Sequence, residues 1–111
     1  MANIIPTAFK SELLSGTHNF ANGGNSFKLA LYTSNPYTAS STTYSTTNEV
    51  SSTGTSYSAG GQALGSQAVA TTSTTAHVDF ADETFSSVTL TAAFAAIYND
   101  TNSDKLCLVL D

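Results

Sequence analysis

The sequence predicts a mainly β fold, an antiparallel β-sandwich or flattened barrel with one short N-terminal helix. Sixteen Ser and eighteen Thr together occupy 34 of the 111 positions, and Thr favours strands while Ser favours turns. Glu, Lys, Arg and Met, which favour helices, are scarce. Several short segments alternate apolar and polar side chains, as half-buried strands do. A chain of this length is expected to form a single domain over residues 1–111.

A helix is expected over residues 6–15. Pro6 suits its first turn, where the missing N–H costs nothing, and Phe9, Leu13 and Leu14 form one apolar stripe. A helix this short is marginal on its own. The stripe must therefore dock on the sheet or on a neighbouring subunit, which makes Phe9, Leu13 and Leu14 candidate partner contacts.

Residues 26–33, which follow a Gly- and Asn-rich turn, form the clearest strand. Phe27 and Leu29 point to one face, and Lys28 and Tyr32 point to the other. Both faces are rather apolar. This pattern favours a central strand or a strand partly covered by a partner.

A long hydroxyl-rich loop is expected over residues 34–58. It contains Tyr37, Tyr44 and Tyr57 but few aliphatic side chains. One interpretation is a flexible surface loop. The other is a contact loop, since Tyr, Ser, Thr and Asn suit adaptable binding surfaces, and it makes the three tyrosines candidate partner contacts. Residues 48–50 are expected to form a short ordered anchor within the loop.

Three further strands are expected in the second half of the chain, over residues 62–70, 76–81 and 85–91. The first alternates small apolar and polar side chains. The second places Val78 and Phe80 on the buried side. Together with the other strands they would complete an antiparallel fold of six or seven strands.

The final unit, residues 92–111, is expected to be a hairpin. Its strands, 92–98 and 105–110, flank six consecutive turn formers. One face of the last strand would carry Leu106, Leu108 and Leu110, and the other Cys107 and Val109. The chain stops at Asp111, directly after this apolar strand, so we expect either further sequence or docking of the strand against another chain.

Charge and hydropathy argue against several partners. The net charge is −5, with three Lys and no Arg, whereas nucleic-acid binding needs clustered basic side chains. The sequence has no polybasic segment that could bind an anionic membrane surface. No apolar run approaches the roughly 18 residues of a membrane span. Residues 1–14 do not resemble a signal peptide. We therefore expect the protein to be made in a cytoplasm and to bind neither nucleic acid nor membrane.

The sequence nominates no catalytic or cofactor-binding residue. Only His18 and His77 could act as a general base, and no Gly-x-Ser-x-Gly elbow, dinucleotide fingerprint or Walker loop is present. Cys107 lies among aliphatic neighbours and is interpreted as a core residue. An enzyme would require one of the histidines in a cleft beside a perturbed acid.

Two groups of polar residues have side chains of the kinds that bind metal ions. His77 and Asp79 share a strand face with acids nearby, but a solvated face is favoured over a weak divalent-ion site. Asp100, Asn102 and Asp104 alternate as in half a calcium loop, yet the central Gly and distal Glu are missing. A plain hairpin turn is favoured, and no metal site is predicted.

Four groups of motifs span most of the chain. They are Ile5-Pro6-Thr7-Ala8-Phe9-Lys10-Ser11-Glu12-Leu13-Leu14 with Gly16-x-His18-Asn19-Phe20; Phe27-Lys28-Leu29-Ala30-Leu31-Tyr32-Thr33; Thr46-Thr47-Asn48-Glu49-Val50 with Ala59-Gly60-Gly61; and Ala96-Ile97-Tyr98-Asn99-Asp100 with Leu108-Val109-Leu110-Asp111. These motifs resemble small structural proteins of tailed bacteriophages, of the marine and cyanobacterial phage type. The resemblance implies a further Gly-rich turn and strand, which this chain lacks.

The resemblance implies a non-enzymatic virion protein, made in the host cytoplasm. The expected role is capsid decoration or cementing, or another head-associated role, through contacts with other virion proteins and as a homo-oligomer. The alternative is a tail or fibre module for host recognition, in which Tyr37, Tyr44 and Tyr57 stack on sugar rings. Neither role requires a cofactor.

Overall fold

Six strands and one helix form in the part of the chain that the computed structural model describes, residues 3–85 and 90–111. The mainly β, antiparallel class with one short helix is confirmed. The elements are α1 (Thr7–Leu14), β1 (Phe27–Tyr32), β2 (Gln62–Ala63), β3 (Ala68–Thr72), β4 (Thr75–Asp79), β5 (Phe94–Asn99) and β6 (Lys105–Leu110). The helix lies inside the expected range, 6–15.

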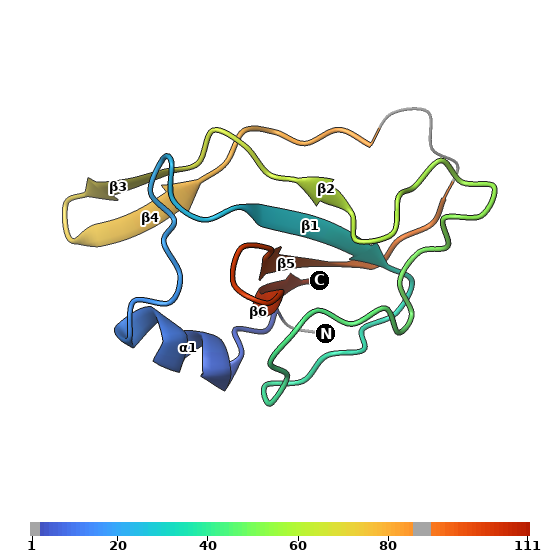
Figure 1. Cartoon of the computed structure of the whole chain (residues 1–111), viewed down its shortest axis with the longest axis horizontal. Helices are drawn as coiled ribbons and strands as arrows, with labels where there is room; N and C mark the ends of the chain where they lie inside the picture. Colours follow the sequence, from blue (N-terminus) through green and yellow to red (C-terminus); the bar gives the residue numbers. More distant parts are fainter. Residues whose placement is uncertain (1–2, 86–89) are drawn as a thin grey trace.

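The main sheet has four antiparallel strands in the order β2-β1-β5-β6 (Figure 1). β1 pairs with β5 along its whole length, from Phe27 opposite Asn99 to Tyr32 opposite Phe94. The strand expected at residues 26–33 and the C-terminal hairpin are therefore both confirmed. β1 is a central strand, as its two apolar faces predict.

Both faces of the sheet are covered, by different parts of the chain. On one face Ala30 and Tyr32 pack with side chains of β5, β6 and the loop at 34–58. On the other, Phe27 packs with Phe9 of α1, with Phe20 against the same cluster. The rings of Phe20 and Phe27 stack with centroids 4.3 Å apart, a geometry worth about 1 kcal/mol beyond area burial.

A bulge in the last strand changes which of its side chains share a face. Ile97 is paired with Leu108 and Tyr98 with Leu106, so Cys107 is the extra residue. Leu106 packs with Val109 on one face, and Cys107 packs on the other with Leu108 against the same cluster. The expectation that Leu106 and Leu108 share a face is wrong, because simple alternation does not survive a bulge.

The outer edge of β6 is covered by the protein's own chain. Ile4 exchanges two backbone hydrogen bonds with Val109, of 2.9 and 2.8 Å. Further along, Leu106 donates to Thr42 O at 3.0 Å, and Tyr44 donates to Asp104 O at 2.9 Å. These bonds satisfy N–H and C=O groups that, on an unpaired edge strand, could pair with another chain. The edge therefore needs no docking chain at these positions.

The segment after β2 departs from the expected core strands. β3 and β4 pair only with each other and form a separate two-stranded ribbon, linked by Ser73 and Thr74. All their residues are exposed, so the expectation of a buried Val78 is wrong, whereas Phe80 packs against the cluster around Phe27. In the strand expected at 85–91, Phe85 and Leu90 lie outside any strand, and residues 86–89 fall outside the described part of the chain.

Gly61 is required where the chain enters β2. Its φ is +82°, and a Cβ added there would lie 1.8 Å from the carbonyl oxygen of Leu29. Neither feature tolerates a side chain. This close approach allows β2 to pair with β1 directly after the turn.

Gly61→Ala is expected to lower the free energy of unfolding by about 3 kcal/mol or more, since strain and a backbone clash combine. Gly54→Ala is the matched control, because Gly54 has a φ of +72° but open space around its Cβ position, and it should cost about 1 kcal/mol. Urea unfolding followed by circular dichroism measures both. Equal costs would contradict the proposed clash.

Candidate interaction surface

The apolar stripe of α1 is divided between the core and the surface. Phe9 is buried against the sheet and His18. Leu13 remains 45 % exposed and Leu14 is 92 % exposed. The stripe therefore docks on the sheet through Phe9 alone, and assignment of Leu13 and Leu14 as partner contacts remains a prediction.

An apolar groove lies between α1, the β3–β4 ribbon and the sheet. Its volume is about 480 Å³. Its lining is almost entirely hydrophobic: Ile5, Phe9, Leu13, Phe20, Val69, Ala76, His77, Val78, Phe80, Ile97 and Leu108. Since Val69 is opposite Val78 in the ribbon, their side chains share the face directed at the groove. Exposed apolar side chains thus bound the groove on both the helix and the ribbon side.

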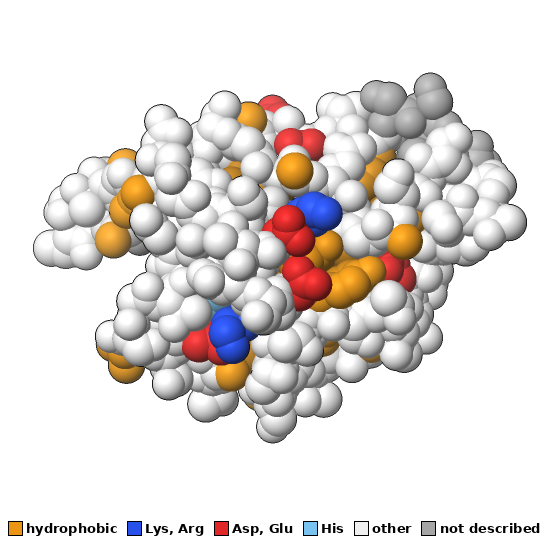
Figure 2. All heavy atoms as spheres, viewed as in Figure 1, with side chains coloured by type: hydrophobic (Ala, Val, Ile, Leu, Met, Phe, Trp, Pro, Cys, Tyr) orange, Lys and Arg blue, Asp and Glu red, His pale blue; other side chains and the backbone are white. Residues whose placement is uncertain are grey.

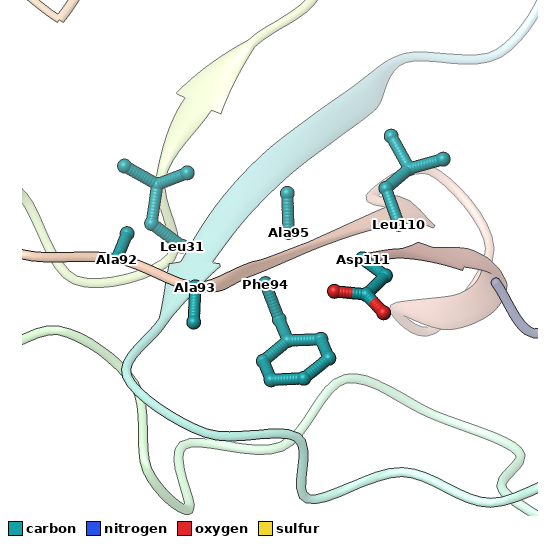
Figure 3. A pocket seen from close by; sticks show the side chains of 7 residues that line it. All are labelled: Leu31, Ala92, Ala93, Phe94, Ala95, Leu110 and Asp111. Carbon is teal, nitrogen blue, oxygen red and sulfur yellow. The ribbon is translucent and has the colours of Figure 1, made fainter. Parts of the chain in front are cut away.

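A second, shallower hollow lies where β5 begins, at Phe94. Its volume is about 240 Å³, and it is lined by Leu31, Leu110, Asp111 and residues 92–95. Figure 3 shows Leu31, Ala95 and Leu110 on one side of the strands and Phe94 pointing to the other. Leu110 is the exposed large hydrophobic side chain here. The hollow is half the volume of the groove and offers a smaller apolar surface.

The tyrosines of the long loop do not form an exposed binding platform. Tyr37 is 5 % exposed and Tyr57 is 2 % exposed, so the expectation that they stand exposed is wrong. Tyr44 is half-buried and stacks on Tyr98, with centroids 4.6 Å apart. The loop folds its rings inward onto the sheet, because their hydroxyls find buried partners there.

A carboxylate within the loop is the partner of two of these tyrosines. Glu49 Oε1 accepts a hydrogen bond from the hydroxyl of Tyr44. Glu49 Oε2 accepts from the hydroxyl of Tyr57 and from the N–H of Gly60, both at 2.7 Å. Tyr57 in turn accepts from the N–H of Leu31 at 3.0 Å. One acidic side chain therefore joins the loop, the glycine turn and β1.

The backbone beside Glu49 pairs with the end of β1. Thr33 donates to Asn48 O at 2.9 Å, and Val50 donates to Leu31 O at 3.0 Å. The ordered anchor expected at residues 48–50 is thus present. Asn48 has a φ of +61°, a conformation that Asn tolerates better than most residues.

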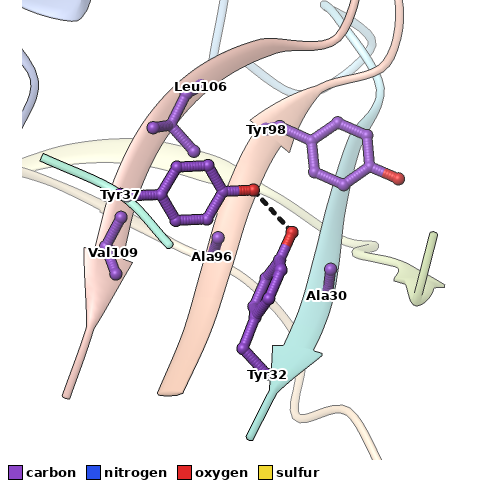
Figure 4. Packing of buried hydrophobic residues seen from close by; sticks show 7 residues of the cluster. All are labelled: Ala30, Tyr32, Tyr37, Ala96, Tyr98, Leu106 and Val109. Carbon is purple, nitrogen blue, oxygen red and sulfur yellow. Dashed lines mark hydrogen bonds between the residues drawn. The ribbon is translucent and has the colours of Figure 1, made fainter. Parts of the chain in front are cut away.

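A tyrosine pair fixes the other end of the loop. The hydroxyls of Tyr32 and Tyr37 share a hydrogen bond of 2.5 Å, drawn in Figure 4. Tyr32 also donates to Ser45 O at 2.7 Å, and Ser45 N donates to Tyr37 at 2.9 Å. The tyrosine hydroxyls thus form two hydrogen-bonded groups, Tyr32 and Tyr37 around Ser45, and Tyr44 and Tyr57 around Glu49, while Tyr98 donates to Gly60 O at 2.6 Å. Burial is the main cause that raises the pKa of all five tyrosines.

His18 is the centre of a second buried network, on the opposite face of the sheet. Asn99 Nδ2 donates to His18 Nδ1 at 2.9 Å, and His18 Nε2 lies 2.8 Å from Glu12 Oε1. Asn99 is oriented by its own Oδ1, which accepts the N–H groups of Thr101 and Asn102. This orientation makes Nδ1 the acceptor and Nε2 the donor, so His18 is the Nε2–H tautomer.

The same network contains the single cysteine. Cys107 Sγ lies 3.9 Å from His18 Nδ1, an arrangement of thiol, imidazole and Glu12 carboxylate that resembles a nucleophilic triad. Burial raises the pKa of the Cys107 thiol to about 12, with a smaller contribution from Glu12. The thiol has no exposed surface and remains protonated at neutral pH, so Cys107 acts as a core residue.

The remaining candidate polar groups lie on the surface. His77 and Asp79 are exposed on the ribbon. Asp104 lies beside Asp100 in the β5–β6 turn, where partial burial and then the neighbouring carboxylate raise its pKa. The described ranges, 3–85 and 90–111, contain no group of three or more His, Cys, Asp or Glu placed to hold a metal ion. Within those ranges, no helix has the length and apolar character to cross a membrane.

Sequence reasoning missed the hydrogen-bonding roles of Glu49 and Asn99. One signal was available for Glu49, since it is the only acidic residue between Glu12 and Asp79 and lies near Tyr44 and Tyr57. Asn99 had no such signal, because Asn is ordinary in a turn. Its bond to His18 spans 81 positions of the chain, which no local pattern reveals.

Comparison with known protein families, curated proteins and solved structures found no match to this chain.

Replacing Glu49 by Gln is expected to lower the free energy of unfolding by about 2–3 kcal/mol, because an amide N–H₂ would face donors that now bond to a carboxylate. Hydrogen exchange should accelerate first in residues 34–60. Asp82→Asn, an exposed change of the same chemistry, is the control and should have almost no effect. Unaltered exchange in the loop of the Gln variant would contradict the role of Glu49.

The protein is expected to unfold in alkali between about pH 10 and 12. The five tyrosines and Cys107 have pKa values above their ordinary 10.0 and 9.0. Below about pH 9 both folded and unfolded states hold these protons, so this stability is complete. As the pH rises further, the unfolded state releases protons first, and folding is progressively disfavoured.

A pH titration that follows tyrosinate absorbance and near-ultraviolet circular dichroism together tests this expectation. The two signals should change in one cooperative step. Tyrosinate that forms gradually from pH 9 upward, while the circular dichroism stays native, would contradict it.

Proposed function

We propose that this protein is a non-enzymatic structural component of a tailed-bacteriophage particle, acting as a capsid decoration or cement protein through contacts with other proteins. The observation that carries the proposal is the apolar groove with its exposed rim. Ile5, Leu13, Val69 and Val78 all line it and all remain exposed. Contiguous exposed apolar surface is typical of protein contact sites.

The rest of the surface supports a role in contact and not in charge-driven binding. Charged residues make up 10 % of the chain, and Figure 2 shows them gathered along the middle of one face, with uncharged side chains around them. Such a surface offers apolar and hydrogen-bonding contacts to a shell. The motifs that resemble phage structural proteins support the same setting, a virion protein made in the host cytoplasm.

The placement of the histidines supports a non-enzymatic role. The side chain of His18 is fully buried and both its ring nitrogens have protein partners, so it presents no nitrogen to a substrate. His77 lies exposed on a two-stranded ribbon. It lines the apolar groove, whose lining residues include no carboxylate that could orient a histidine as a general base.

The alternative role, glycan recognition at a tail or fibre, has weaker support. It depended on Tyr37, Tyr44 and Tyr57 as exposed stacking rings. Two of these are buried and the third is stacked on Tyr98. The hydroxyl-rich surface is the feature that still favours it.

Two experiments separate these roles. Antibody labelling and cryo-electron microscopy of phage particles should place the protein on the capsid. The purified protein should also bind capsids of a phage in which its gene has been deleted, and should not bind glycans extracted from the host surface. Glycan binding without capsid binding would replace the first role by the second.

Leu13→Asp is expected to weaken capsid binding at least about tenfold, since a charge enters the apolar groove. Leu13 is 45 % exposed, so the β content of the variant should be unchanged. Ser52→Asp, a charge added at an exposed loop position, is the control and should bind like the parent protein. Unchanged binding of the Leu13 variant would exclude the groove as the contact.

A further inference from the structure

The outer edge of β3 is open. Within residues 3–85 and 90–111, the hydrogen bonds of its backbone are those to β4. Thr72 is opposite Thr75 across a two-residue turn, and the pair that flanks such a turn is hydrogen-bonded. Alternation then directs the N–H and C=O groups of Val69 and Thr71 away from β4. These groups can accept another strand.

This edge lacks the features that normally prevent pairing between molecules. Edge strands are protected by charges, by Pro or by bulges. β3 has none of these, and no charged residue occurs between Glu49 and Asp79. Figure 2 shows hydrophobic and uncharged atoms, without red or blue, over the outer part of the ribbon. β4 differs, because it ends in Asp79.

The ribbon is also incomplete as a folded unit. All ten residues of β3 and β4 are exposed, and an isolated two-stranded ribbon is marginal in water. The whole chain exposes 6240 Å², against about 5,800 Å² for a monomer of this mass. Its radius of gyration is 14.1 Å, against about 13 Å for a compact domain of this length. Additional strands would cover surface that the monomer leaves in water.

We infer that a second copy of this chain pairs with β3 edge to edge, across a twofold axis, to give a four-stranded antiparallel ribbon. Identical strands related by such an axis run antiparallel. With the axis beside Ala70, Val69 lies opposite Thr71 of the partner subunit, and the outward N–H and C=O groups of both residues are satisfied. The inference goes beyond the proposed function, since it names a contact between two copies of this chain.

The symmetry of the edge favours a second copy over an unrelated partner strand, because the residues with outward backbone groups, Val69 and Thr71, lie one on each side of Ala70. Each molecule carries a net charge of −5, so two copies repel each other over most approaches. The ribbon edge is an uncharged path on which that repulsion is smallest. The same edge on both molecules is complementary to itself, as a twofold interface requires. The pairing buries less than the roughly 800 Å² per partner of a standard interface, so a dissociation constant in the micromolar range is expected.

A charge exchange at Ala70 tests the pairing. Ala70 is exposed, so Ala70→Lys and Ala70→Glu should leave the monomer folded. At about 100 µM, well above a micromolar dissociation constant, the parent protein should sediment at twice its mass of 11.5 kDa. Each variant alone should sediment as a monomer, since like charges meet at the axis, and an equal mixture of the two should regain the dimer.

His77→Lys is the matched control. His77 is opposite Ala70 within the ribbon, so its charge lies on the same face but one strand away from the open edge. This variant should remain dimeric. A monomeric parent protein, or a dimer that neither Ala70 variant disturbs, would overturn the inference.

The outcomes are separable from those that test the proposed function. A monomer in solution that still binds capsids would overturn the β3 pairing alone. A dimer disrupted and restored by the Ala70 variants, without capsid binding, would support the pairing and reject the role on the particle.

Discussion

The half-buried carboxylate of Glu49 joins three segments of the chain by hydrogen bonds. It accepts hydrogen bonds from Tyr44, Tyr57 and the N–H of Gly60, and hydrogen bonds to a charged group are worth about 1.5–3 kcal/mol each. The loop at 34–58 contains neither helix nor regular strand. Its position on the sheet therefore depends on isolated backbone bridges to β1 and β6 together with side-chain hydroxyls, and Glu49 is the acceptor for two of these hydroxyls.

Irregular segments are held on the two faces of the sheet by different side chains. On one face, tyrosine hydroxyls converge on Glu49. On the other, amide and imidazole groups converge around Asn99 and His18, while Asn25 Oδ1 accepts from Asn99 and Asn102. Each network joins an irregular segment to the sheet by hydrogen bonds. Because the polar atoms of the network have partners, the network stabilises the fold. Each network contains one carboxylate, Glu49 or Glu12, and its other hydrogen-bonding side chains are mostly uncharged.

Local pattern predicted some elements and failed for others, for identifiable reasons. The alternation at 26–33 and the turn formers after Tyr98 are strong signals, and β1 and the β5–β6 hairpin follow them. The predicted assignment of β6 side chains to the two faces was wrong, because the bulge at Cys107 arises from the pairing of β6 with β5. The predicted burial of Val78 was wrong, because alternation shows that a strand has an apolar face but does not show what covers that face. The groove was therefore not predictable, although its rim residue Leu13 was a candidate from the helix stripe.

The two ends of the described chain lie beside each other at the β6 edge. Ile4 exchanges backbone hydrogen bonds with Val109, and Asp111 N donates to Asn3 Oδ1 at 2.8 Å. Adjacent ends allow a domain to be inserted into a loop of a host protein or to be circularly permuted. A short Gly-Ser linker could therefore join residue 111 to residue 3. New termini opened in the exposed segment at 51–54 would remove no side chain of either network, and the hydrogen bonds of Glu49 to Tyr57 and Gly60 would then hold the two sides of the break together.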